Sequence, residues 1–247
     1  MKASPLLAAD GPGAASALGL VESDRRTVRS VDGSAVGGFA DFADLVHDRL
    51  CAVQPGDVNA VVLDAYAWVA AESDRSGGLG WIYEAGRDEF ADRANAALVG
   101  EDDDGRLMNT TKVPAWRRWL RFMGLGQAMP DMLDYPSPAS RLAIELRRSG
   151  SGGSTMDSNS FLQVVATRCP YLDRGRLFNQ ACRRIGHTPS TGRLSPLLSG
   201  ALRDLHDEGA LTLQLAGDSA GAVLLSAEPT HSMGSFTSVM IPSEIVS

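Results

Sequence analysis

The sequence predicts a mainly α-helical protein, with a helical N-terminal domain and a C-terminal winged-helix domain of the α+β type. Three observations favour this fold. Apolar residues recur at helical spacing in successive segments between residues 39 and 208. Gly and Pro residues separate these segments. The last helical segment is followed directly by two short apolar runs with a turn between them, which is typical of a β-hairpin wing.

Residues 1–37 are interpreted as the remnant of a further winged-helix module. Ala14–Leu18 suits the end of a helix, and residues 20–31 suit a short hairpin. The first two helices of such a module have no counterpart in the sequence, so either the segment is a remnant or the interpretation is wrong.

Residues 38–148 are expected to form the helical domain. Its strongest features are apolar stripes with suitable first residues, such as Asp57 as a cap and Pro114 and Pro138 in first turns. The expected helices are Phe39–Leu50, Asp57–Ala71, one or two within Trp81–Leu98, Asn109–Met123 and Ser137–Arg148.

Residues 149–156 are rich in Gly and Ser and are expected to form a flexible linker between the two domains. Residues 157–247 then form the winged-helix domain. Three helices are expected, at Asp157–Arg168, Asp173–Ile185 and Ser195–Glu208, followed by a hairpin between 211–215 and 223–225.

Composition limits the function. The 247-residue chain has a formal net charge of −7, so any contact with nucleic acid has to come from a local basic patch. Three cysteines in a chain of this length do not suit a disulfide framework. The sequence holds no apolar run of transmembrane length, and its first residues make a poor signal peptide. We therefore expect a cytoplasmic protein with no membrane partner.

No motif in the sequence, taken with its context, indicates a catalytic, cofactor-binding or metal-binding site. A Walker A loop and a Cys-x2-Cys metal pair are absent, and the Gly-x-Ser-x-Gly string at 217–221 lies in the turn of the expected hairpin, without the helix that a nucleophile elbow requires. We therefore predict no enzyme, no catalytic residue, no cofactor and no metal ion. An active site assembled from residues that are distant in the sequence is left open.

A basic and aromatic helix is the first candidate binding surface. Lys112, Arg117, Arg118 and Arg121 surround Trp116, a combination that suits nucleic acid or an acidic partner. The alternative is that the tryptophans belong to the core and that the arginines only solvate the outer face.

The third helix of the winged-helix domain is the second candidate. Arg203 is its one cationic side chain, and Arg193 precedes it. Three carboxylates share the polar face of this helix, which favours protein contacts over DNA reading. The candidate nucleic-acid or partner residues are therefore Lys112, Trp116, Arg117, Arg118, Arg121, Arg193 and Arg203.

Three segments carry a family resemblance: NTTKVPAWRRWLRFMGLG (109–126), DYPSPASRLAIEL (134–146) and LSPLLSGALRDLHDEGALTL (194–213). With them the chain, over roughly residues 14–242, resembles the DpdG-like group of small accessory proteins encoded beside helicases and nucleases in bacterial anti-phage clusters. The resemblance carries over no catalytic residue. It implies a role in a multi-protein defence complex that acts on foreign DNA. The expected winged helix, the basic and aromatic helix and the absence of catalytic motifs then favour a non-catalytic subunit that bridges protein partners, a helicase or a nuclease, and contacts double-stranded DNA. A winged-helix transcription regulator is the alternative.

Overall fold

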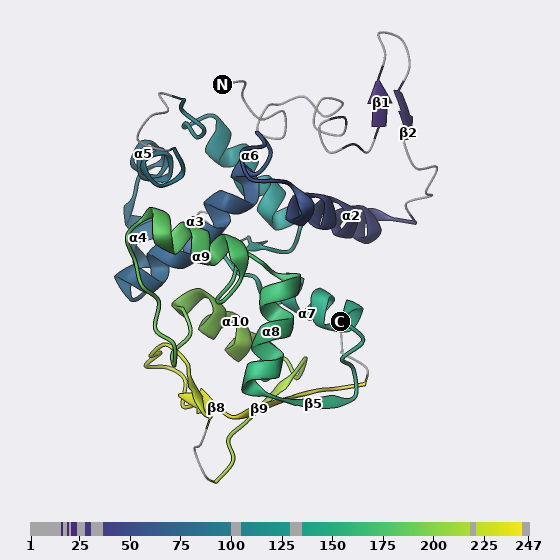
Figure 1. Cartoon of the computed structure of the whole chain (residues 1–247), viewed down its shortest axis with the longest axis vertical. Coiled ribbons are helices and arrows are strands. Elements are labelled where there is room, and N and C mark those ends of the chain that lie inside the picture. The colour runs from purple at the N-terminus through teal and green to yellow at the C-terminus, as the bar shows by residue number, and fades with distance from the viewer. Residues whose placement is uncertain are drawn as a thin grey trace.

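The computed structural model describes residues 16, 19, 21–23, 28–30, 37–99, 105–128, 135–217 and 221–243 (Figure 1). Helices dominate this part of the chain, so the prediction of a mainly α-helical protein is confirmed. Within these ranges, no helix combines the length and the apolar character needed to cross a bilayer. The helices are α2 (Phe39–Ala52), α3 (Val61–Ser76), α4 (Gly80–Glu84), α5 (Arg87–Leu98), α6 (Lys112–Phe122), α7 (Ala139–Arg148), α8 (Ser158–Arg168), α9 (Arg176–Arg184) and α10 (Pro196–Asp207).

Helix α3 is the central element of the core. Its VVLDAYAWVAA run is apolar on nearly every side, and 13 of its 16 residues are buried. A helix that is apolar all round is stable only when other elements surround it. Helices α2, α5, α9 and α10 pack against it, and Gly77 ends it in the left-handed conformation.

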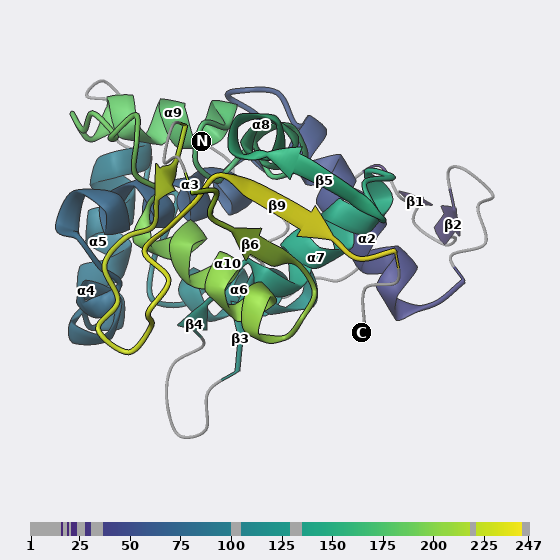
Figure 2. The same ribbon diagram turned by 90° about the horizontal axis from the view of Figure 1, so that it is seen from below.

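A three-stranded antiparallel sheet covers one end of the C-terminal helices (Figure 2). Its order is β5 (Ser154–Asp157), β9 (Ser238–Ile241) and β6 (Thr212–Gln214). Smaller antiparallel pairs are β1 (Val21–Ser23) with β2 (Val28–Ser30), β3 (Gly126–Gln127) with β4 (Tyr135–Pro136), and β7 (Val223–Leu224) with β8 (Ser235–Phe236).

The wing hairpin predicted between residues 211–215 and 223–225 is wrong in its pairing. Strand β6 pairs with β9, and β7 pairs with β8. The reason is β9, whose Val239 and Ile241 are fully buried in the middle of the sheet, a segment that the sequence pattern did not identify as a strand. The short hairpin expected within 20–31 is present as β1 and β2. Apart from Ser16, the helix end expected at 14–18 lies outside the described residues.

The segment expected to be a flexible linker contains strand β5. Gly150 and Gly153 make its turns with positive φ angles of 73° and 74°. Buried residues on both sides of this segment form one hydrophobic core, in which α9 packs along α3. The division into two domains that fold independently stays a prediction.

Asp173 joins the turn before α9 to the start of α10. Its carboxylate accepts hydrogen bonds from the Ser195 amide at 2.7 Å and the Ser195 hydroxyl at 2.6 Å, while Ser195 itself caps α10. Burial raises the pKa of Asp173 from 3.8 to about 6, against the opposing effect of the Ser195 hydrogen bonds.

This pKa makes a testable contribution to stability. The folded protein holds the Asp173 proton more tightly than the unfolded chain does, so the stability it adds is present below about pH 4 and is lost as the pH rises through about 6. From ~1.4 kcal/mol per pKa unit, the loss is about 3 kcal/mol. We expect the Asp173→Asn variant to lack this loss when urea unfolding is compared at pH 4 and pH 7. Equal pH dependence in the variant and the wild type would contradict the assignment.

Candidate functional site

The seven predicted site residues do not form one surface. Five lie on α6, Arg193 lies in the loop before α10, and Arg203 lies within α10. Three of them, Trp116, Arg117 and Arg203, are buried.

Trp116 belongs to the core. Its side chain is 3% exposed, and its indole Nε1 donates a hydrogen bond to the Val62 carbonyl at 2.9 Å. Its ring packs against Phe90 at a centroid distance of 5.5 Å. A buried tryptophan whose N–H has a partner has no face left for stacking on a base. The expectation that Trp116 contacts a ligand is therefore corrected.

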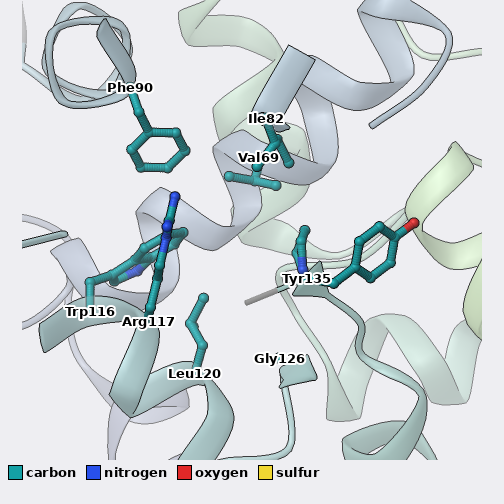
Figure 3. A pocket seen from close by; sticks show the side chains of 9 residues that line it. Val69, Ile82, Phe90, Trp116, Arg117, Leu120, Gly126 and Tyr135 are labelled. Atoms are coloured by element: carbon teal, nitrogen blue, oxygen red, sulfur yellow. The ribbon is translucent and has the colours of Figure 1, made fainter. Parts of the chain in front are cut away.

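Arg117 also points into the protein. It is 8% exposed, and its guanidinium carbon lies 5.7 Å from the Phe90 ring centroid, a cation–π contact. Figure 3 shows it extending between Trp116 and Leu120 at a small apolar cavity. The cavity volume is about 20 Å³, room for roughly one water molecule. The cavity is therefore a packing feature and too small for a ligand.

Lys112 is tied to the backbone that precedes α6. Its Nζ donates to the Leu107 carbonyl at 2.9 Å and lies 3.4 Å from the Arg106 carbonyl. Partial burial lowers the pKa of Lys112. These contacts give it a structural role in holding the segment before α6.

The outer face of α6 remains accessible. Arg118 and Arg121 are both exposed there. The sequence placed Arg117 on this same outer face, but residues 113, 117 and 120 lie on one side of the helix, and that side is buried.

An aromatic cluster lies where α6 meets α2. Four rings form this α2–α6 aromatic cluster: Phe39, Phe42, Trp119 and Phe122. The Phe122 ring centroid is 4.9 Å from that of Phe39, 5.5 Å from that of Phe42 and 5.7 Å from that of Trp119. The sequence pattern placed Phe39 and Phe42 on an apolar core stripe, yet Phe39 is 74% exposed. Its position as the first residue of α2, directly after Gly37 and Gly38, is the signal that separates it from the core.

Arg203 is a structural arginine. It is 6% exposed, and its Nη2 donates to the Ser226 carbonyl at 2.7 Å and the Met233 carbonyl at 3.1 Å. These hydrogen bonds fix the loop after β7 to α10, and burial lowers the pKa of Arg203. The expectation that this side chain faces a ligand is corrected.

Helix α10 does not present a free face of the kind that reads DNA. It packs against α3, α7 and β6. Its exposed residues Asp204 and Asp207 line, together with Glu228, a groove of about 620 Å³. Burial, together with the nearby Glu208 and Asp207 carboxylates, raises the pKa of Asp204. A surface with these charges repels phosphate.

Arg193 is exposed and lines a separate pocket with Arg174, Ser190 and Thr191. Sequence reasoning missed Arg174. The available signal was charge, because residues 174–203 contain six Arg and no Asp or Glu in a chain whose net charge is −7.

A buried thiol–imidazole–carboxylate arrangement is the strongest candidate for catalysis among the described residues. Cys51 Sγ lies 3.5 Å from His47 Nε2, and Glu145 Oε1 lies 3.5 Å from His47 Nδ1. However, the Tyr171 hydroxyl is closer to Nε2, at 2.9 Å, and burial raises the pKa of Cys51 far above its usual value. A thiol held in its protonated form is a poor nucleophile.

The same cluster has the spacing of a metal site, because ligand atoms of His47, Asp48 and Glu145 lie within 4.8 Å of one another. The Arg148 guanidinium already pairs with both carboxylates, at 2.5 Å to Asp48 and 2.7 Å to Glu145. Both carboxylates are thus already paired with a cationic side chain. The cluster is best explained as a tie between α2 and α7.

Comparison with known proteins gives one match. The family model described as DpdG-like matches residues 15–219, which is well over half of the chain. The comparisons with curated proteins and with solved structures returned no match.

Proposed function

The chain belongs to the DpdG-like family, and from this membership we propose that it is a non-catalytic accessory subunit of a bacterial anti-phage defence complex. In this proposal it acts in the cytoplasm by binding a protein partner, a helicase or a nuclease, and it also contacts DNA. The proposal takes the defence context from the family resemblance and the mode of action from the surfaces of the protein.

The α2–α6 aromatic cluster is the observation that carries the partner contact. Phe39 leaves most of its ring in water, which is unfavourable unless a partner covers it. The exposed arginines Arg118 and Arg121 lie on α6, the helix that also supplies Trp119 and Phe122. Aromatic residues and Arg are enriched in the energetic centres of protein interfaces, so this surface has the composition of a docking site.

The C-terminal region supports the same mode of action. We propose that helices α8, α9 and α10 with the sheet β5–β9–β6 form a winged-helix module and that this module makes protein contacts. A transcription regulator would insert its third helix into the major groove. Helix α10 is packed on three sides and acidic on the exposed one, which favours the accessory role over a regulator.

Co-purification tests the partner contact. The tagged protein is expressed together with the helicase and nuclease encoded beside it, and the wild-type chain is expected to retain one of them. The Phe39→Ser variant is expected to retain at least about tenfold less, because a central aromatic contact contributes about 2 kcal/mol or more to binding. Its fold should persist because the side chain is mostly exposed.

Leu215→Ser is the matched control, since Leu215 is a large apolar side chain that is 57% exposed outside this cluster. Full retention of the partner by Phe39→Ser would remove the aromatic cluster from the proposal. Failure of the wild-type chain to retain any neighbour-encoded protein would remove the accessory role itself.

A further inference from the structure

The pocket lined by Arg174 and Arg193 lies between the turn that precedes α9 and the loop that precedes α10. Its volume is about 400 Å³. Two arginines, two hydroxyl side chains, one amide and one carboxylate contribute the polar groups of its lining: Arg174, Arg193, Ser190, Thr191, Asn179 and Asp173. All of these side chains except the carboxylate can donate hydrogen bonds, and guanidinium groups in particular match the oxygens of a phosphate.

Both arginines are anchored through their backbones. Arg174 has a φ of 65° and is the one non-glycine residue with positive φ in the described part of the chain. The Asn179 side chain donates to its carbonyl at 2.9 Å. Arg193 lies between two backbone hydrogen bonds, from Leu224 to the Gly192 carbonyl and from Leu194 to the Leu224 carbonyl, both 2.9 Å. Strained residues that the surrounding structure holds in place cluster at functional sites.

The guanidinium groups keep donors available. Arg174 uses Nη1 for one hydrogen bond to Asn159 Oδ1 at 3.0 Å and has four other N–H groups. The Arg193 guanidinium forms no hydrogen bond or ion pair with any residue that the structure describes.

The Asp173 carboxylate also lines the pocket, but its described hydrogen bonds go to Ser195 and not to either arginine. Both oxygens of Asp173 accept hydrogen bonds from Ser195. Beyond Asp173, the next acidic residue along the chain is Asp204, so the whole segment around the pocket is cationic. Arg176 and Arg183 are exposed on α9, seven residues apart and therefore about 10 Å apart along the helix axis.

We propose that this pocket binds a phosphate group of a nucleic-acid backbone through Arg174 and Arg193, with the α9 arginines extending the contact along the strand. The proposal deepens only the DNA contact of the proposed function. It places that contact at α9 and the loop before α10, away from the residues of α6 that the sequence indicated. If the protein retained no partner in co-purification, the phosphate-binding proposal would be unaffected. If the pocket bound no phosphate, the accessory role would be unaffected.

The test is a fluorescence anisotropy titration of a labelled 20-base-pair duplex of generic sequence at several salt concentrations. The pocket variant is Arg174→Gly with Arg193→Gln, in which glycine keeps the left-handed backbone. The matched control is Arg87→Gln with Arg147→Gln, which removes the same charge from exposed positions on α5 and α7. A second comparison, Arg118→Gln with Arg121→Gln, tests the surface of α6.

The wild-type chain is expected to bind the duplex with an affinity that falls steeply with salt. The pocket variant should bind at least about tenfold more weakly at low salt, and its salt slope should be smaller by about one, because both arginines are assigned to the same phosphate. The Arg87 and Arg147 control should change neither value by a comparable amount.

Three outcomes would overturn the proposal. The wild-type chain fails to bind the duplex at low salt, or the α6 variant loses binding while the pocket variant does not, or the pocket and control variants lose binding equally. A parallel titration with inorganic phosphate identifies the source of the ligand. Micromolar binding of free phosphate without duplex binding would assign the pocket to a small anion and reject a nucleic acid.

Discussion

Replacing Gly175 by alanine is expected to lower the free energy of unfolding by about 3 kcal/mol or more, which is the upper range for overpacking a closed site. A Cβ atom at this position would lie 2.6 Å from the Pro170 carbonyl carbon and 2.8 Å from the Leu172 carbonyl oxygen, and closer still to the Pro170 oxygen. All three atoms belong to the backbone, so no side-chain rotation relieves the collision.

The collision matters because this turn positions α9. The Pro170 carbonyl accepts hydrogen bonds from the amides of Leu177 and Phe178, and the Gly175 amide donates to the Leu172 carbonyl. Opening the turn would therefore disturb the first turn of α9, which packs on the central helix α3. Urea denaturation followed by circular dichroism measures the loss.

Gly200→Ala is the control for this variant. Gly200 lies within α10, and nothing stands within 4 Å of the position of its added Cβ. Alanine is favoured over glycine inside a helix by about 0.5 to 1 kcal/mol, so this variant should be slightly more stable than the wild type. Similar effects of the two substitutions would show that the turn is not as tightly packed as the distances indicate.

The turn at Gly175 also shows what the sequence reveals and what it leaves out. The start of α10 was predictable from a local signal, since Ser195 followed by Pro196 begins the expected helix and Ser195 does cap α10. The need for glycine was not predictable, because the atoms that exclude a side chain come from the folded path of residues 170–172.

Strand pairing was unpredictable for a similar reason. The alternating residues around Leu213 identified an extended segment, and β6 is indeed there. Its partner, β9, lies more than 20 residues further along the chain. A nearby turn favoured the local hairpin, whereas the burial of Val239 and Ile241 decides the pairing in the folded protein.

The candidate site shows the limit of assigning charged side chains from sequence. Four α6 residues were assigned to one surface as a basic patch, yet Arg117 packs on Phe90 and Lys112 caps backbone carbonyls. The helical spacing of Val113, Arg117 and Leu120 puts these residues on one side of the helix, and it therefore predicts correctly that Arg117 is buried. The pocket at Arg174 and Arg193 brings together two loops, and only the absence of acidic residues between 174 and 203 pointed to it.

Arg141→Met is expected to destabilise the protein by about 3 to 5 kcal/mol, the usual cost of removing one member of a buried ion pair. Arg141 is 1% exposed and connects three segments. Its Nε donates to the Met123 carbonyl at 2.6 Å, and its Nη1 contacts Asp44 at 2.5 Å and Glu145 at 3.3 Å. Methionine fills much of the same volume but leaves the Met123 carbonyl without this donor and weakens the pairing of a buried carboxylate.

Arg148→Met provides the comparison that separates burial from charge. Arg148 pairs with the same Glu145 and with Asp48, but it is about one-third exposed, so solvent screens its interactions and a loss of about 1 kcal/mol is expected. The double variant Arg141→Met with Glu145→Gln should recover part of the Arg141 loss, because the buried Glu145 carboxylate, which has lost one of its two guanidinium partners, is then replaced by a neutral amide. Equal losses in the free energy of unfolding for Arg141→Met and Arg148→Met, with no recovery in the double variant, would contradict this prediction. They would mean that the cost depends on the number of charges removed and not on how deeply the arginine is buried.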